Sequence, residues 1–444
     1  MSSFLGNFSR KLLISSHHPF QFARRFLYCV LVVTAFGQLA KLFIFAGTPE
    51  AVFRSDLTQD YVVGRALLTG LDCRIPVDSL VKTLLASDSV PALPHASPHS
   101  PLINLIFLPL SLLEPKVAHQ LWVLISALCG FAAFYILGDL VQLTRKGTVA
   151  LLWLCLAIFS VPGVGDLLHG QWNFQQMLIL SLFLRAHFRG QFIKSAAYLA
   201  FVVALRPIVI PLCIYSLITS NKRFRSAFIV SLGAITLALL FTLGSTVILS
   251  FPAAARSALS VWEGFWANLS TGSLAANLFL PMNAVANEVY PLPVLPRPIT
   301  TLYKIVGGAL SVGLCLVSVL RAHNREPLQA MMSMLVISPL IAVIAWPHYL
   351  VLLFIPLFVD GARLLNHSGL RGRLAVVALI IPMVYPAVTI LGLVASKNSF
   401  APAVPVAISL QGRLVYSVLT LLPILAWGLY PLTKAGSYRS KSAH

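Results

Sequence analysis

The chain has 444 residues, of which 58% are hydrophobic and only 10% are charged, and its mean hydropathy is +0.86. These values exceed the apolar share of a water-soluble domain and predict an all-α integral membrane protein with many spans. The net charge of +19 would suggest a nucleic-acid partner in a soluble protein. Here many lysines and arginines stand in short loops between apolar runs, so the charge indicates membrane orientation, and we expect no nucleic-acid partner.

The first apolar run, at residues 26–45, predicts a retained signal anchor. No clear cleavage site precedes the polar residues that follow it. The run comes after a basic group formed by Arg10, Lys11, Arg24 and Arg25. Because basic flanks stay on the cytoplasmic side, we expect the amino terminus there.

Further apolar runs have nearly the roughly 20 residues that a helix needs to cross a bilayer. We place spans at about 26–45, 118–138, 148–162, 174–186, 226–250, 299–320, 328–345, 349–364, 374–396 and 413–433. With these spans the basic loops and both termini are cytoplasmic. Residues 195–218 have basic loops on both sides, so we infer two half-helices that enter and return around Arg206-Pro207. The prediction is one membrane domain, residues 1–444, with about 10–12 transmembrane segments.

Under this topology, the acidic residues are distributed unequally between the two membrane faces. Asp139, Glu326 and Asp360 fall on the inner side, and the other acidic residues fall outside. The two long loops, at 46–117 and 251–298, are also external. This concentration indicates chemistry on the outer face, although solvated loops also carry charges for no catalytic reason.

The first external loop contains two candidate carboxylates. Asp60 and Gly64 follow helical spacing, which predicts an amphipathic helix at the membrane surface. Gly70 is suited to end this helix. Asp56 lies at or just before its first turn, where it either caps the helix or takes part in chemistry.

Two histidines follow later in the same loop. His95 and His99 stand among closely spaced prolines, which favour extended backbone and could present both imidazoles to one site. The alternative is that both side chains are simply solvated. An arginine in an apolar stretch is also a candidate. Arg206 would cost about 2.5–3.5 kcal/mol at the bilayer centre, so it faces a cavity or a partner, or it extends to the interface.

Two breaks between apolar runs carry further polar groups. His348 stands in Trp346-Pro347-His348-Tyr349, as a site residue or as an ordinary turn histidine. Gln171, Trp172 and Asn173 form the other break. Amides hydrogen-bond sugar hydroxyls and aromatic rings cover sugar faces, but tryptophan is also a common interfacial anchor.

Several of these motifs occur together in an order that resembles glycosyltransferase family 87, a group of GT-C enzymes. They are Asp56 before Ala66-Leu67-Leu68-Thr69-Gly70, a Pro-rich turn into Pro101-Leu102, Gly170-Gln171-Trp172-Asn173, Ala204-Leu205-Arg206, Ser273-Leu274 with Asn277, and Ser338-Pro339 through Trp346-Pro347-His348-Tyr349. One element departs from the family pattern. His99-Ser100-Pro101 stands where the family commonly has Tyr-Pro-Pro, which bears on the identity of the substrate.

The resemblance implies a GT-C-like helical bundle in the bacterial plasma membrane, with surface helices in its external loops. The implied reaction moves a sugar, typically mannose or a related sugar, from a polyprenyl-monophosphate donor. The acceptor would be a lipid or glycan on the non-cytoplasmic face, and the anomeric carbon would be inverted. The expected partners are these substrates and the membrane lipids.

The reaction needs a base for the acceptor hydroxyl and cationic donors for the departing phosphate. Asp56 is the candidate base and Asp60 the reserve. Arg206 and His348 are the candidates for the phosphate. The remaining predicted substrate-binding residues are His95, His99, Gln171, Trp172, Asn173 and Asn277. We expect no cofactor and no metal, because neither an Asp-x-Asp motif nor a metal-ligand spacing of cysteines occurs in the sequence.

Two other functions use the same features. A transporter or flippase of a lipid-linked sugar would also need an intramembrane arginine and broken helices. Transporters commonly have internal repeats, and the two halves of this sequence show none. A membrane scaffold without catalytic activity is the third interpretation.

Overall fold

The structure, a computed structural model, describes residues 17–86, 95–262, 327–342 and 344–359, with isolated positions at 298, between 301 and 316, and at 380. Within these residues every regular element is a helix. This confirms the predicted all-α fold of a polytopic membrane protein. Some predicted features lie outside the described residues, namely Asn277, the span at 413–433 and nearly all of the span at 374–396.

Three helices in the described part of the chain are long and apolar enough to cross a membrane. They are α2 (His17–Ala46), α7 (Pro115–Leu140) and α13 (Lys222–Trp262). At about 1.5 Å per residue, the 26 residues of α7 extend about 39 Å, which exceeds the ~30 Å of bilayer hydrocarbon. Each of the three overlaps a span predicted from the sequence.

A fourth candidate span is bent by 77° between α8 (Lys146–Phe159) and α9 (Val161–His169). Ser160 separates the helices with extended backbone, and its hydroxyl accepts a hydrogen bond from the N–H of Gly163 at 3.0 Å. A Cβ at Gly163 would come within 1.9 Å of the Ala157 carbonyl oxygen, so the tight bend requires glycine there. The sequence predicts one span at 148–162, whereas the structure bends at Ser160-Val161-Pro162-Gly163, where the Pro-Gly pair favours a break.

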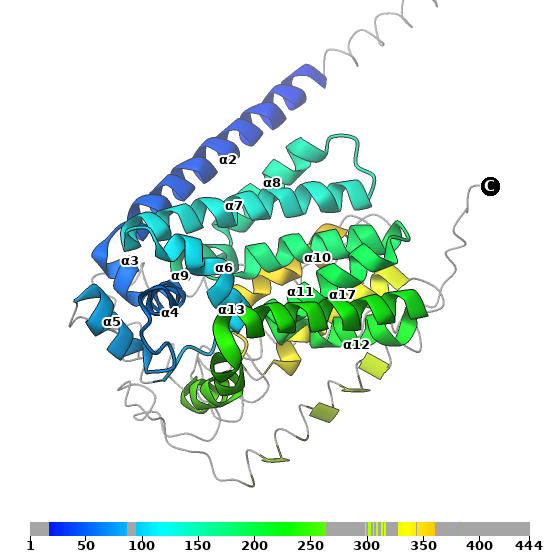
Figure 1. The fold of residues 1–444 in the computed structure, drawn as a ribbon. Helices are drawn as coiled ribbons and strands as arrows, with labels where there is room; N and C mark the ends of the chain where they lie inside the picture. Colours follow the sequence, from blue (N-terminus) through cyan, green and yellow to red (C-terminus); the bar gives the residue numbers. More distant parts are fainter. Residues whose placement is uncertain are drawn as a thin grey trace, which may run out of the picture.

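The helices pack side by side (Figure 1), with a large apolar core among the long helices and a smaller apolar cluster around the first long loop. α7 contacts α8 and α10 (Asn173–Phe188), and α11 (Phe192–Leu205) lies between α10 and α13. Phe134, Phe174 and Phe183 are fully buried members of this core. The apolar faces of neighbouring helices therefore fix how the turns at their ends lie relative to one another.

The predicted break at Arg206 is confirmed. α11 ends at Leu205, and after Arg206 the chain continues as η1 (Pro207–Val209) and α12 (Ile210–Thr219). Arg206 has extended backbone, with φ −149° and ψ 119°, because a following proline disfavours helical backbone. α12 packs against α17 (Pro327–Ile341), whereas α11 packs mainly against α10 and α13. The prediction that the chain returns through α12 to the membrane side at which α11 begins is not tested by this arrangement.

The first long loop folds into four helices beside α7: α3 (Pro49–Arg54), α4 (Leu57–Thr69), α5 (Val77–Leu85) and α6 (Pro101–Ser111). α4 ends at Gly70 with a left-handed backbone, as predicted. Asp56 makes no side-chain capping bond, so capping is not its role in this structure. Most of α4 is buried, because Gly64 lets it approach α6 so closely that a Cβ would lie 2.2 Å from Oγ of Ser111. α4 is thus more enclosed than a surface helix.

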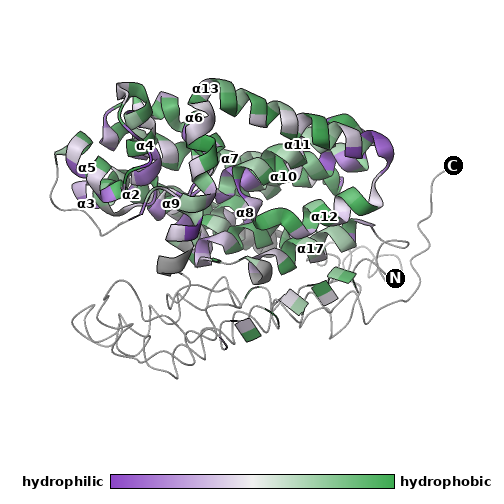
Figure 2. Cartoon of the chain, turned by 60° about the horizontal axis from the view of Figure 1, so that its bottom comes forward, coloured by the Kyte–Doolittle hydropathy of each residue, from purple (hydrophilic) through white to green (hydrophobic). Residues whose placement is uncertain are grey.

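The bundle has hydrophilic residues at both ends and apolar helices between them (Figure 2). The helices α3, α4 and α5 lie at one end in both views (Figures 1 and 2). The turns that join α7 to α8, α10 to α11 and α12 to α13, together with the first residues of the helices after them, contain several basic residues, namely Arg145, Lys146, Arg189, Lys222 and Arg223. The acid-rich loop and the basic turns thus occupy different parts of the bundle.

Candidate active site

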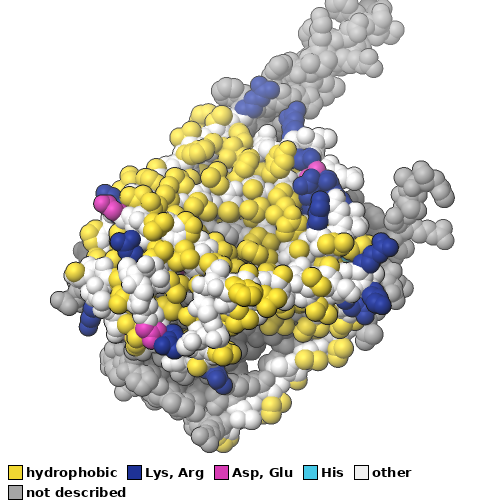
Figure 3. All heavy atoms as spheres, viewed as in Figure 1, with side chains coloured by type: hydrophobic (Ala, Val, Ile, Leu, Met, Phe, Trp, Pro, Cys, Tyr) yellow, Lys and Arg dark blue, Asp and Glu magenta, His cyan; other side chains and the backbone are white. Residues whose placement is uncertain are grey.

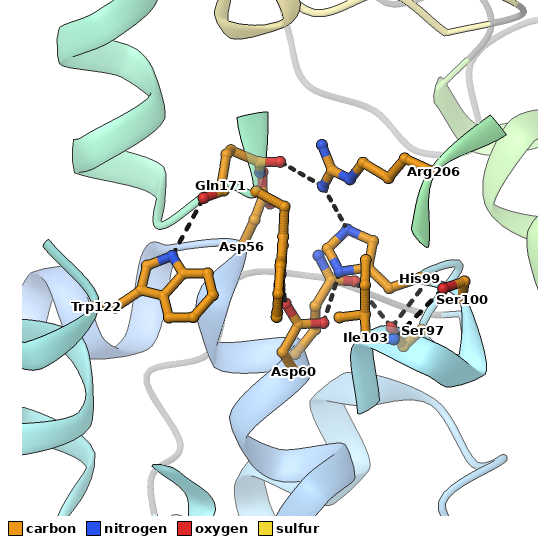
Figure 4. A network of polar contacts seen from close by, with 11 residues as sticks. Asp56, Asp60, Ser97, His99, Ser100, Ile103, Trp122, Gln171 and Arg206 are labelled. Carbon is orange, nitrogen blue, oxygen red and sulfur yellow. Dashed lines mark hydrogen bonds and ion pairs between the residues drawn. The ribbon is translucent and has the colours of Figure 1, made fainter. Parts of the chain in front are cut away.

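A polar cluster forms where the first loop meets the turns after α9 and α11 (Figure 4). Asp56 directly precedes α4, Gln171 follows α9 and Arg206 follows α11. Nε2 of Gln171 donates to Oδ2 of Asp56, and Oε1 of Gln171 accepts from Nη2 of Arg206 at 2.6 Å. One amide therefore brings the predicted carboxylate and the predicted cation together.

The turn after α9 fixes the position of Gln171. α9 ends at Gly170, whose φ of +64° favours glycine. The N–H of Gln171 donates to the Asp166 carbonyl at 2.8 Å, and its carbonyl accepts from Nε1 of Trp122 at 3.2 Å. A Cβ at Gly170 would lie 2.5 Å from Cβ of Leu57, the residue that follows Asp56. The turn therefore packs directly against the start of α4.

Asp60, the reserve base, is fully buried and is bonded through both carboxyl oxygens. Oδ1 accepts from Nδ1 of His99 at 2.6 Å, and Oδ2 accepts from Nε1 of Trp172 at 2.9 Å. Because Nδ1 of His99 donates to Asp60, Nε2 of a neutral imidazole is free to accept from Nη2 of Arg206, 3.3 Å away. Asp60 thus positions His99 and Trp172, and Asp56 remains the accessible carboxylate.

Arg206 is only 7% exposed, and its guanidinium lies 5.2 Å from the centre of the Tyr349 ring. Its carbonyl accepts from Nε2 of Gln176 at 3.3 Å. Nη1 is buried and has no hydrogen-bond partner among the described residues. A buried charged donor without a partner is costly, so this nitrogen is suited to an anionic ligand.

His348 provides a second buried nitrogen of this kind. It lies near the start of η2 (Pro347–Leu353), and its side chain is 6% exposed. Nε2 makes no hydrogen bond to any described residue. The ring packs against Tyr349, with 4.9 Å between centroids, and Tyr349 also faces the guanidinium of Arg206. Tyr349 therefore connects the two predicted phosphate-binding residues.

Asn173 and Trp172 make contacts that stabilise the turn between α9 and α10. Asn173 donates to Oδ1 of Asp166 through Nδ2, at 2.6 Å, and through its backbone N–H, at 3.3 Å. Trp172 is 2% exposed and packs on Trp122, with ring centroids 4.4 Å apart. These contacts brace the turn that contains Gln171. A role of either side chain in substrate binding stays a prediction.

His95 lies in the same loop as His99 but is bonded to its own backbone neighbour. Its Nδ1 is 2.9 Å from the Ala96 carbonyl oxygen, and the side chain is 4% exposed. Burial lowers the pKa of His95 below its ordinary value. The neutral imidazole is therefore favoured, and contact of His95 with a substrate stays a prediction.

Three residues of this site have contacts that the sequence does not reveal: Asp166, Gln176 and Tyr349. Asp166 had a signal, because an acidic residue in an otherwise apolar helix needs a polar partner. No group of three or more His, Cys, Asp and Glu side chains among the described residues is arranged to hold a metal ion. This arrangement of side chains does not test the prediction that the protein needs no metal ion.

The fold and this cluster define a class of protein: a polytopic helical membrane protein whose buried polar site joins carboxyl, imidazole and guanidinium groups. The family model of glycosyltransferase family 87 matches residues 99–347, more than half of the chain, and the chain belongs to that family. It is therefore a membrane glycosyltransferase. The match includes His99, Gln171 and Arg206, whereas Asp56 lies before it and His348 directly after it. A search of curated proteins found no match.

Proposed function

We propose that this glycosyltransferase moves a sugar, mannose or a related one, from a polyprenyl-monophosphate donor to a lipid or glycan acceptor on the non-cytoplasmic face. The observation that carries the proposal is the bridge made by Gln171, which holds Asp56 and Arg206 on one amide. A base and a phosphate-binding cation are the two groups that such a transfer requires close together.

The transfer is a single displacement. The acceptor oxygen attacks the anomeric carbon from the face opposite the phosphate, and the bond from that carbon to the phosphate oxygen breaks with its electron pair on the phosphate. Attack from the opposite face inverts the anomeric configuration. Asp56 takes the proton of the acceptor hydroxyl, because it is partly exposed and Oδ1 has no hydrogen-bond partner among the described residues.

The departing phosphate gains negative charge as the bond breaks. Nη1 of Arg206 is a buried donor and Nε2 of His348 is a buried ring nitrogen, neither has a hydrogen-bond partner among the described residues, and both side chains lie close to Tyr349. The guanidinium, and a neutral His348 imidazole in the tautomer that has its hydrogen on Nε2, would each donate to a phosphate oxygen. A site that excludes water strengthens these bonds, and loss of one such donor typically slows catalysis by about 10²–10³-fold.

The proposed membrane face follows from the distribution of charge. The acid-rich loop helices and the basic turns occupy different parts of the bundle. Basic turns are retained on the cytoplasmic side, so the site beside the first loop faces the opposite side.

The experiment is sugar transfer by the purified full-length chain. The protein in lipid nanodiscs would receive polyprenyl-phosphate mannose and a set of lipid acceptors, and mass analysis would identify the products. Asp56→Asn should slow product formation by about 10²-fold or more, and Asp72→Asn, which changes an exposed acid of the same loop paired with Arg74, should leave it intact. Full activity of Asp56→Asn would refute the assignment of the base. Movement of the lipid between leaflets without sugar transfer would instead support a flippase.

A further inference from the structure

A second charged cluster lies at the other ends of α7 and α10, away from the candidate active site. Asp139, near the end of α7, pairs with Lys146 at the start of α8. Its Oδ2 also lies 2.8 Å from Nε of Arg185 and 2.5 Å from Nη2 of Arg189. One carboxylate thus joins the ends of three helices.

This cluster, defined by Asp139, Lys146, Arg185 and Arg189, has an excess of positive charge. Three cations face one carboxylate, which leaves a net charge of +2. The Asp139 side chain is 15% exposed, whereas the cations are 31–48% exposed. Each arginine also has more N–H donors than its contact with Asp139 uses. The cluster is therefore suited to bind an additional anion.

A cavity of about 410 Å³ lies beside the cluster. Asp139, Lys146 and Arg189 contribute charged side chains to its lining, and Leu140, Leu143 and Phe188 contribute apolar ones. Figure 3 shows Lys and Arg side chains gathered around an acidic group at one end of this face, next to an extensive hydrophobic surface. A ligand of this cavity would contact cations and apolar side chains at once.

We infer that this cavity binds the phosphate headgroup of an anionic phospholipid. Cations in a cavity between helix ends bind phosphate oxygens, and the neighbouring apolar side chains are suited to the start of the acyl chains. A free phosphate ion would use the cations but would leave Leu140, Leu143 and Phe188 without a partner. The lipid would connect α7, α8 and α10 at the membrane surface. This inference does not depend on the proposed transfer reaction.

Native mass spectrometry of the full-length chain in detergent tests the inference with phosphatidylglycerol and phosphatidylcholine as probes. The wild-type protein should retain phosphatidylglycerol in preference to phosphatidylcholine. Lys146→Gln with Arg189→Gln should reduce that retention about tenfold or more, because each cation near a membrane surface contributes to anionic-lipid binding. The matched control is Lys222→Gln with Arg223→Gln, which removes the same charge from the start of α13, outside the lining of the cavity, and should not change retention.

A variant of the carboxylate separates lipid binding from a purely structural role. Asp139→Asn removes the competing anion and keeps every cation, so it should retain phosphatidylglycerol at least as well as the wild type. Loss of retention in Asp139→Asn, or unchanged retention in the double variant, would overturn the inference. Millimolar inorganic phosphate provides a further test. If it displaces the lipid and by itself raises the melting temperature as much as phosphatidylglycerol does, the cavity binds a soluble anion and the inference is overturned.

Discussion

Oδ1 of Asp60 accepts a 2.6 Å hydrogen bond from Nδ1 of His99, and the other nitrogen of that imidazole lies 3.3 Å from Nη2 of Arg206. Asp60 thereby determines which nitrogen of His99 faces the arginine. Asp56 and Asp60, the two candidate carboxylates of the first loop, thus have different roles. Asp56 is available to a substrate, and Asp60 holds an imidazole in place.

The difference between the two acids predicts different defects. Asp60→Asn should lower the stability of the protein by about 1–3 kcal/mol, because an amide cannot accept both buried hydrogen bonds. Asp56→Asn should leave the melting temperature nearly unchanged and should lower kcat by about 10²-fold or more. Thermal melting and sugar-transfer assays on both variants measure this contrast. Equal melting temperatures with equal losses of activity would show that the two residues share one role.

Gln171→Leu should lower kcat/KM by about 10–100-fold. The leucine keeps the approximate size of the side chain but removes the bonds to Asp56 and Arg206, and hydrogen bonds to charged groups contribute about 1.5–3 kcal/mol each. Gln175→Leu is the control, because Gln175 is also buried but donates to Ser126 instead. Transfer kinetics that fall equally in both variants would contradict a bridging role of Gln171.

Gly170→Ala should destabilise the protein by about 2–4 kcal/mol. The left-handed backbone disfavours an L side chain, and the new methyl group would meet Leu57. Gly147→Ala in α8 is the comparison, because a Cβ there meets nothing within 4 Å. It should be neutral or slightly stabilising. Thermal unfolding of the two variants checks the prediction, and equal melting temperatures would argue against the tight packing of the turn on α4.

The burial of His95 predicts that the stability of the protein depends on pH. Burial lowers its pKa in the folded protein, so folding favours the neutral imidazole over the charged one. This contribution is complete above the unfolded pKa of about 6.5 and is lost as the pH falls through the lower folded pKa. The melting temperature should therefore decrease from pH 7.5 to pH 5.5, and less steeply in His95→Asn. Identical slopes for wild type and variant would show that His95 contributes nothing to this dependence.

Much of the framework was predictable because local chemistry determines it. Gly70 ends α4 through its left-handed backbone, and the proline after Arg206 breaks the helix there. The bend after α8 has a local signal in Ser160-Val161-Pro162-Gly163, but its tightness was not predictable, because it depends on the close approach of Gly163 to a carbonyl of the preceding helix. Hydropathy identifies apolar runs but contains no information on such contacts.

Asp56, Arg206, Gln171 and His99, which the sequence names as candidates, lie together in the structure, but the contacts of each could not be predicted. Helical spacing indicates α4, yet it does not decide which acid meets a substrate. That choice depends on His99 and Trp172, which arrive from other segments and occupy both oxygens of Asp60. In the same way, only the tertiary arrangement brings Tyr349 to Arg206.

The most direct test of the central claim is an experimental structure of the full-length chain with a non-transferable polyprenyl-phosphate sugar analogue. The account predicts a phosphate oxygen within about 3 Å of Nη1 of Arg206, and the sugar between that phosphate and Asp56. A phosphate bound away from Arg206, or a sugar whose anomeric carbon faces away from Asp56, would contradict it.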